Sequence, residues 1–262
     1  MSSKDSVAGT IKVALILCVV CSVFISSAAV ILKPFQVSNK LLDRNKNILA
    51  AAGMFDPALN SNAEVDELFA RFTIQVVELD TGDVLSEDRL AALGIDAATY
   101  DERSVLTDPQ FSDVLGAEED IADLKRRVRY STVYTVPAAD GSVETIVLPV
   151  SGYGLWGTIY GYLALDGDGN TVNGIGFYEH KETPGLGGEI NNPRWKALWP
   201  GKKVYDEQGN VALSVIKGGG EGEFEVDGLS GASLTSRGVD NMIEFWLGPQ
   251  GFGPFLTKLS EG

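Results

Sequence analysis

The sequence predicts an α+β protein in which one N-terminal transmembrane helix precedes a domain with an antiparallel sheet and flanking helices. Three observations support this: an uncharged apolar run near the N-terminus, β-branched segments separated by turn residues in the second half, and an amphipathic pattern near the C-terminus. We expect an N-terminal segment, a transmembrane helix, a mostly helical leader region and the sheet domain, at residues 1–12, 13–32, 33–130 and 131–262.

The apolar run Val13–Leu32 contains no charged side chain. At ~1.5 Å per residue, a helix of this length spans the ~30 Å hydrocarbon core of a bilayer. Pro34 is expected to end the helix. The alternative is a cleaved signal peptide with its small-residue site at Ser26–Ala29, but apolar cores of signal peptides are usually shorter, at about 7–15 residues. We therefore favour a retained anchor.

Charge divides the chain unevenly. Residues 1–46 hold six of the 21 Lys and Arg but only two of the 36 Asp and Glu, so the rest of the chain is strongly acidic. Such a body repels nucleic acid, and we exclude nucleic-acid binding. Two lysines precede the apolar run and four basic residues follow it closely, which by itself places the body weakly in the cytoplasm.

Cysteine and histidine usage excludes several kinds of site. Cys18 and Cys21 are the only cysteines, and both lie inside the apolar run. The body therefore has no disulfide, no catalytic thiolate and no cysteine-ligated cluster. His180 is the only histidine, which rules out a multi-histidine metal centre, and we expect no metal site.

The leader region is predicted to contain helices at residues 37–55 and 62–72 and a strand at 73–79. Residues 81–130 are acidic and rich in Ala and Leu, and we expect them to be helical in pieces.

The second half is predicted to form an antiparallel meander. Strand patterns cover residues 130–136, 143–150, 155–165 and 171–178. Asp140–Gly141 marks the first turn and Asp166–Asn170 the last. The last turn lacks the complete calcium-loop pattern, so we interpret it as a hairpin. Strands do not alternate with helices, which disfavours a Rossmann fold.

The last predicted element is an amphipathic helix. Apolar residues recur with helical spacing at Val239, Met242, Ile243, Trp246 and Leu247. We expect Thr235 or Ser236 to act as N-cap and Gly248–Pro249 to end the helix.

Two segments could carry chemistry. The glycines of His180–Gly188 permit close backbone approach to a flat or anionic ligand, although the segment is neither a GxGxxG nor a Walker motif. In Ser230–Ser236, small neighbours leave the Ser233 hydroxyl sterically open. The N-terminus of the following helix would stabilise a phosphate there by about 1 kcal/mol, besides its hydrogen bonds. Residues alone leave the alternatives of a simple turn and an ordinary N-cap loop.

These two segments carry a resemblance to a known family. The run Asp227-Gly-Leu-Ser-Gly-Ala-Ser-Leu-Thr235 resembles the flavinylation motif of FMN-binding electron-transfer domains. His180-x-Glu-Thr-Pro-Gly-Leu-Gly187 resembles their flavin-cradling loop. With the N-terminal span and Phe245-Trp-Leu-Gly248, the whole chain resembles the family of C subunits of the sodium-translocating NADH:quinone reductase. It matches the related G subunits of Rnf complexes less well.

The resemblance implies a function and a location. FMN would be bound covalently as a phosphoester of Ser233, attached by a flavin transferase. The chain would carry electrons within a multisubunit, sodium-pumping complex of the bacterial inner membrane, and would not catalyse the reaction alone. The N-terminus would be cytoplasmic and the FMN-binding domain extracytoplasmic, on the periplasmic face. Family members usually carry Thr at the acceptor position, where this chain has Ser233, and Thr235 is the alternative acceptor.

The resemblance also implies roles for individual residues. We expect Asp227 to orient the acceptor loop, Lys217 to offset the phosphate or flavin charge, and Trp156 or Tyr153 to stack on the ring. The remaining candidates form the acceptor loop, Ser230, Gly231 and Ala232, or line the isoalloxazine, Glu182, Thr183, Leu186 and Gly187.

Three other hypotheses remain open at this point. The chain could be the equivalent flavin subunit of an Rnf-type complex, or an anchored extracytoplasmic binding module without a redox role. It could also be a membrane-tethered hydrolase that uses Ser233 as nucleophile. The hydrolase would need a base, and only His180 or a lysine could serve.

Overall fold

The computed structural model describes residues 7–56 and 59–261. They form two compact units, one ending at Arg44 and one beginning at Asn45. The helix α1 runs from Val7 to Ala51. Its residues up to Arg44 belong to the first unit, and its last residues belong to the second. Residues 1–6 of the predicted N-terminal segment lie outside the described residues.

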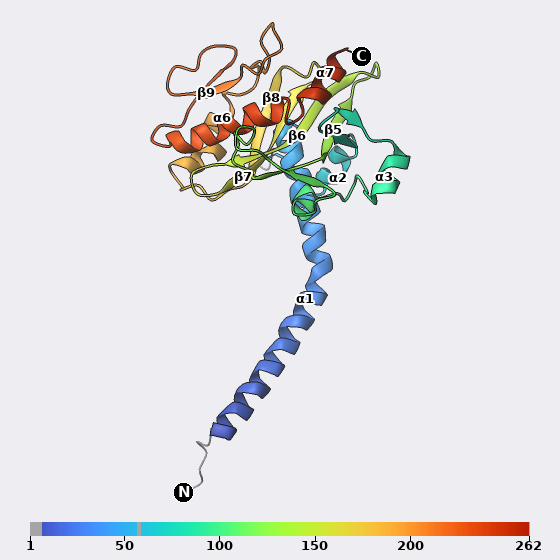
Figure 1. Ribbon diagram of the computed structural model, residues 1–262, viewed down its shortest axis with the longest axis vertical. Helices are drawn as coiled ribbons and strands as arrows, with labels where there is room; N and C mark the ends of the chain where they lie inside the picture. Colours follow the sequence, from blue (N-terminus) through green and yellow to red (C-terminus); the bar gives the residue numbers. More distant parts are fainter. Residues whose placement is uncertain (1–6, 57–58, 262) are drawn as a thin grey trace. The chain divides into compact units, whose positions relative to one another are not determined.

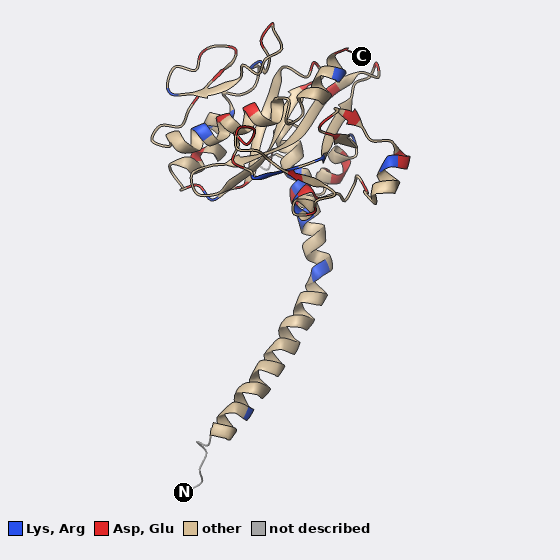
Figure 2. Ribbon diagram, in the orientation of Figure 1, with Lys and Arg blue, Asp and Glu red and all other residues tan. Residues whose placement is uncertain are grey.

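Helix α1 is 45 residues long and contains Pro34 in its interior. The prediction that Pro34 ends the helix is therefore wrong. Proline removes only one backbone donor, and apolar spans tolerate it where the freed groups find other partners. Among the described residues, α1 is the one helix long and apolar enough to cross a membrane, with a mean hydropathy of 2.8 in its most apolar window. Figure 2 shows few charged residues along its apolar stretch.

The second unit is a six-stranded sheet with helices and two small strand pairs (Figure 1). The strands are β1 (Thr73–Glu78), β2 (Asp83–Val84), β3 (Ser112–Val114), β4 (Arg126–Val128), β5 (Tyr130–Pro137), β6 (Val143–Tyr153), β7 (Thr158–Asp166), β8 (Val172–Glu179), β9 (Ser214–Ile216) and β10 (Glu225–Asp227). The helices are α2 (Glu64–Phe69), α3 (Glu87–Leu93), α4 (Glu102–Val105), the 3₁₀ helix η1 (Gly187–Asn191), α5 (Pro193–Lys196), α6 (Ser233–Leu247) and α7 (Gly253–Glu261).

The main sheet has the order β2-β1-β5-β6-β7-β8, with every neighbouring pair antiparallel. The predicted meander β5 to β8 is confirmed, including the hairpin at Asp166–Asn170. The predicted strand at 73–79 is also confirmed as β1, which pairs with β5.

The leader region is less helical than the sequence suggests. Its β1 and β2 extend the main sheet, and β3 and β4 form a separate antiparallel pair within the stretch expected to be helical. Only the short helices α3 and α4 form between residues 81 and 130. Side chains in this stretch accept local turn hydrogen bonds, for example those of Asp96 and Asp120, and so compete with longer helices.

The main core lies between the sheet and α6. Alternation along β6 places Ile146, Leu148 and Val150 on one face, where they are buried in the same cluster as Met242 and Ile243 of α6. Figure 1 shows α6 crossing this part of the sheet. The predicted amphipathic helix is therefore confirmed.

Helix α6 begins earlier than expected. Ser233 is its first residue and Ala232 its N-cap, so the expectation that Thr235 or Ser236 caps the helix is wrong. Gly231 has φ +77°, which lets the chain turn sharply before the helix. Ser236 lies in the first turn of α6. Its hydroxyl accepts from the Leu229 N–H at 2.9 Å and so holds the preceding loop against the start of the helix.

The other side of the sheet packs against the end of α1 and against α2. A Cβ on Gly174 of β8 would lie 2.4 Å from the Ala51 carbonyl oxygen. Phe69 of α2 meets Tyr134 of β5 with 6.2 Å between ring centroids. The sheet is thus covered on both faces. We therefore expect a ligand-binding site at the end of the sheet near the start of α6.

Candidate functional site

Three loops meet at the first turn of α6: the β6–β7 turn at 154–157, the segment 180–188 after β8, and the β10–α6 loop at 228–232. Their contacts are close. A Cβ on Gly187 would lie 2.4 Å from the Thr235 hydroxyl oxygen, and one on Gly231 would lie 3.6 Å from the Leu186 side chain. Glycine at 187 is therefore required by the packing of the loop on the helix.

Glu182 joins these loops. Its side chain is buried, and its Oε1 accepts from the backbone N–H groups of Leu155 and Trp156, both at 3.0 Å. Its Oε2 accepts from the Thr235 hydroxyl. Glu182 thus lies beneath the loops as their common anchor, and is not exposed as a lining residue.

Thr235 and Ser233 differ in accessibility. The Thr235 residue is 1% exposed and its hydroxyl is bonded to Glu182. Ser233, two residues earlier, is exposed. The helix therefore presents Ser233 to solvent and Thr235 to the interior.

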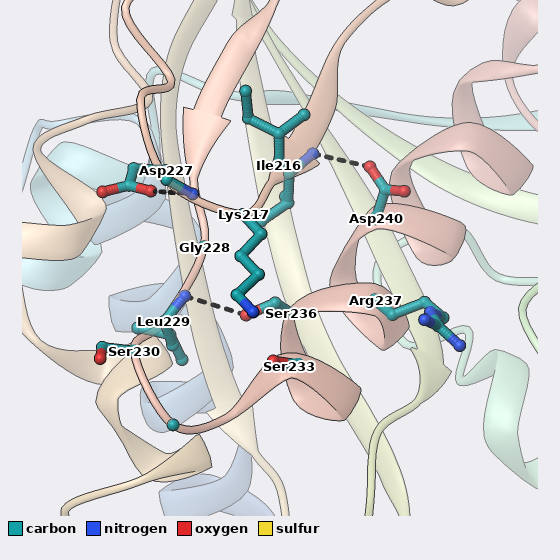
Figure 3. A pocket seen from close by; sticks show the side chains of 13 residues that line it. Ile216, Lys217, Asp227, Gly228, Leu229, Ser230, Ser233, Ser236, Arg237 and Asp240 are labelled. Atoms are coloured by element: carbon teal, nitrogen blue, oxygen red, sulfur yellow. Dashed lines mark hydrogen bonds between the residues drawn. The ribbon is translucent and has the colours of Figure 1, made fainter.

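Ser233 borders a pocket of about 450 Å³, a volume typical of small-ligand sites (Figure 3). The pocket lies between the end of β9, the loop after β10 and the first two turns of α6. Its lining includes the predicted residues Lys217, Asp227, Ser230, Gly231 and Ser233. The other predicted residues, Glu182, Thr183, Leu186, Gly187, Ala232, Thr235 and Trp156, do not line it.

Both signs of charge line the pocket. Lys217 and Arg237 are exposed, and in Figure 3 the Lys217 side chain runs from the end of β9 toward the first turn of α6. Asp227 Oδ1 accepts from the Gly218 N–H at 2.9 Å, and Asp240 Oδ1 accepts from the Val215 N–H at 2.6 Å. Burial raises the pKa of the Asp240 carboxyl above its usual range.

The loops also expose apolar side chains. Leu186 of the 180–188 segment is 48% exposed, Leu234 of α6 52% and Trp156 of the β6–β7 turn 61%. Tyr153 is also exposed, as is Thr183. Exposed large apolar side chains of this kind are typical of surfaces that bind a ligand or a partner.

The only histidine, His180, contacts its own loop and the last residue of η1. His180 Nδ1 accepts from the Glu182 N–H at 3.2 Å, and Nε2 lies 2.9 Å from the Asn191 side-chain amide. His180 is not among the residues that line the pocket beside Ser233, which disfavours it as the base of a Ser233 hydrolase. Within the parts of the chain that the structure describes, no group of three or more His, Cys, Asp or Glu could hold a metal ion.

Sequence reasoning missed several lining residues on α6. Ser236, Arg237 and Asp240 follow Ser233 at i+3, i+4 and i+7, and all four line the pocket. This spacing marks one face of a helix and could have been found from the sequence once the helix start was placed at Ser233. The remaining missed lining residues are Val215, Ile216, Gly218, Gly228 and Leu229.

Comparisons with known proteins agree with this geometry. Residues 154–248 match the family model described as FMN-binding domain. The chain is 52% identical to the C subunit of the Na(+)-translocating NADH-quinone reductase of Pseudomonas aeruginosa, with 100% of this chain and 99% of the relative covered. It is 44% identical to the protein of the same name from Yersinia pestis, with 99% and 96% covered.

Solved structures of C subunits are also similar to this chain. The crystal structure of Shewanella oneidensis NqrC is 35% identical, with a TM-score of 0.76 over 86% of this chain and 100% of that chain. The crystal structure of the C subunit from Parabacteroides distasonis is 27% identical, with a TM-score of 0.65 over 86% of this chain and 97% of that chain. Because the chain is 52% and 44% identical to these two curated C subunits over 99–100% of its length, it belongs to the family of C subunits of the Na(+)-translocating NADH-quinone reductase.

Proposed function

We propose that this chain is the electron-transfer subunit that holds FMN as a phosphoester of Ser233 in a sodium-pumping NADH:quinone reductase. The observation that carries the proposal is the contrast between two hydroxyls on one helix turn. Ser233 is exposed at the edge of the pocket, whereas Thr235 is buried and bonded to Glu182. Only an exposed hydroxyl can be reached by a second enzyme that transfers the flavin.

The residues around Ser233 fit FMN at both ends. The first N–H groups of a helix have no intrahelical partner and favour a phosphate. Lys217 adds a positive charge at the same pocket. Leu186, Leu234 and Trp156 offer exposed apolar surface for a flat ring system. When bound, FMN supplies the redox chemistry, and the protein positions it and tunes its surroundings.

The attachment reaction is a phosphoryl transfer from FAD to the Ser233 hydroxyl. The Ser233 Oγ forms a bond to the phosphorus of the FMN moiety, the pyrophosphate bond of FAD breaks, and AMP leaves. A base on the flavin transferase takes the hydroxyl proton. Serine provides the same nucleophilic oxygen as the threonine usual in this family, without the extra methyl group.

Mass spectrometry of variants tests the acceptor. The full chain, co-expressed with a flavin transferase, is expected to gain the mass of FMN less one water. We expect Ser233→Ala to lose this adduct completely and Ser233→Thr to keep it. Ser230→Ala is the matched control, because Ser230 is also exposed and lines the same pocket, and it should keep the adduct. An adduct that persists in Ser233→Ala would refute Ser233 as the acceptor.

We further propose that residues 45–262 lie on the periplasmic side of the inner membrane, with the segment 1–12 cytoplasmic and α1 as a single-pass anchor. The native cysteines, Cys18 and Cys21, both lie in the apolar part of α1, so the domain offers a clean background for labelling. We expect Ala117→Cys, at an exposed position, to react with a membrane-impermeant maleimide in intact cells. Labelling only after cell lysis would place the domain in the cytoplasm.

Two alternatives make different predictions. An Rnf-type flavin subunit is disfavoured, because relatives named as the C subunit of the Na(+)-translocating enzyme match the chain over nearly its full length. A binding module without redox function would remain colourless, with unmodified mass, even when the transferase is co-expressed.

A further inference from the structure

We propose that Asp240 is a positioning residue that holds Lys217 beside Ser233. This inference rests on the proposed function, because it concerns how the pocket receives the phosphate on Ser233. Lys217 would offset the charge of that phosphate, and its side chain extends toward the first turn of α6 in Figure 3. A flexible lysine needs a well-held backbone to keep its ammonium group at such a place.

Lys217 directly follows β9, a strand of three residues that pairs in parallel with β10. Two carboxylates bracket it. The amide of Val215, two residues before, donates to Asp240 at 2.6 Å, and the amide of Gly218, one residue after, donates to Asp227 at 2.9 Å. The backbone on both sides of Lys217 is therefore fixed by acidic residues of the same pocket.

The segment needs such restraint because it continues into a glycine run. Gly218 and Gly219 have φ of +74° and +81°, and their added Cβ atoms would meet no other atom within 4 Å. Glycines in open space lose more conformational freedom on ordering than other residues do. β9 has only three residues, and its pairing with β10, including the hydrogen bond from the Gly228 N–H to the Ile216 carbonyl at 2.7 Å, is the other backbone support for Lys217.

Asp240 connects this segment to the acceptor. It lies seven residues after Ser233 on α6, so the same helix carries the acceptor hydroxyl and the carboxylate that holds β9. A rigid helix keeps these two groups at a fixed separation. The hydrogen bond between the Val215 N–H and Asp240 thus links β9 directly to the helix that carries Ser233.

A simpler role for Asp240 is to satisfy an otherwise unpaired strand amide. That role predicts an effect of Asp240 substitutions on stability, but no dependence of the flavin-transfer rate on whether Lys217 is present. A double-mutant cycle separates the two roles, because residues that act through one another show non-additive effects.

The experiment measures the initial rate of FMN transfer from FAD to the full-length chain by a purified flavin transferase, followed as flavin fluorescence on denaturing gels. We expect Lys217→Met and Asp240→Ala each to slow transfer about tenfold, the effect of losing one charge-assisted contact. The double variant should be no slower than Lys217→Met alone. Asp240→Asn should recover most of the rate, because its amide oxygen can still accept from the Val215 N–H.

Glu244→Ala is the matched control, since it removes an exposed carboxylate one turn further along α6 and should leave the rate unchanged. If Asp240→Ala does not fold, Asp240→Ser replaces it in both backgrounds. Rates that multiply in the double variant, or an unchanged rate in Lys217→Met or Asp240→Ala, would overturn the positioning role while leaving Ser233 as the acceptor. Absence of any adduct on the wild-type chain would overturn the proposed function itself.

Discussion

Replacing Glu182 with alanine is expected to lower the free energy of unfolding by about 2–4 kcal/mol and to reduce flavin attachment strongly. The substitution leaves three donors without their acceptor: the amides of Leu155 and Trp156 and the hydroxyl of Thr235. Each unsatisfied buried donor costs about 1–3 kcal/mol, and partial access of water to the loops reduces the sum. Chemical denaturation and adduct yield measure the two effects.

Glu182→Gln is the matched control. Its amide oxygen can accept from the two backbone N–H groups, and its NH₂ group can donate to Thr235 once the threonine hydroxyl rotates. We expect a loss of about 1 kcal/mol or less and near-normal adduct yield. If glutamine were as harmful as alanine, the negative charge and not the hydrogen bonding would be what the site needs from Glu182.

A second large effect is expected from Gly238→Ala in α6. A Cβ at this position would lie 2.4 Å from the Tyr153 carbonyl oxygen and 2.9 Å from the Gly154 Cα. Both are backbone atoms at the β6–β7 turn, which cannot move without displacing the loop that Glu182 anchors. Alanine gains about 1 kcal/mol in helix propensity, but overpacking costs about 1–3 kcal/mol or more, so we expect net destabilisation.

Gly238→Ala should also change flavin attachment, because displacing α6 moves Ser233 away from the 180–188 segment. We expect slower flavin attachment in Gly238→Ala together with a lower thermal unfolding midpoint. Gly157→Ala in the β6–β7 turn is the control, since its nearest contact would be the flexible Lys181 side chain at 3.1 Å. Equal stability and transfer rate for Gly238→Ala and the wild type would show that α6 does not rest on this turn as tightly as the structure indicates.

Much of the fold could be predicted because its signals are local. The strands β5 to β8 follow from alternating β-branched residues between turn dipeptides, and α6 from apolar residues at helical spacing. The motif around Ser233 combines small residues with a helix start, and Ser233 and Lys217 both line one pocket.

Other features could not be predicted, either because the structure departs from a local rule or because they depend on contacts between distant segments. The continuation of α1 through Pro34 conflicts with a local rule that is usually reliable. The addition of β1 to the sheet beside β5 depends on a pairing across more than fifty residues of chain. The anchoring role of Glu182 requires knowing that Thr235, in a different segment, donates to it.

The most direct test of the central claim is fragmentation mass spectrometry of peptides from the wild-type chain purified after co-expression with a flavin transferase. The account predicts that the FMN mass lies on the peptide containing Ser233 and that fragment ions assign it to the Ser233 oxygen. An adduct assigned to Thr235 or to any other residue, or a peptide that carries no flavin, would contradict the account.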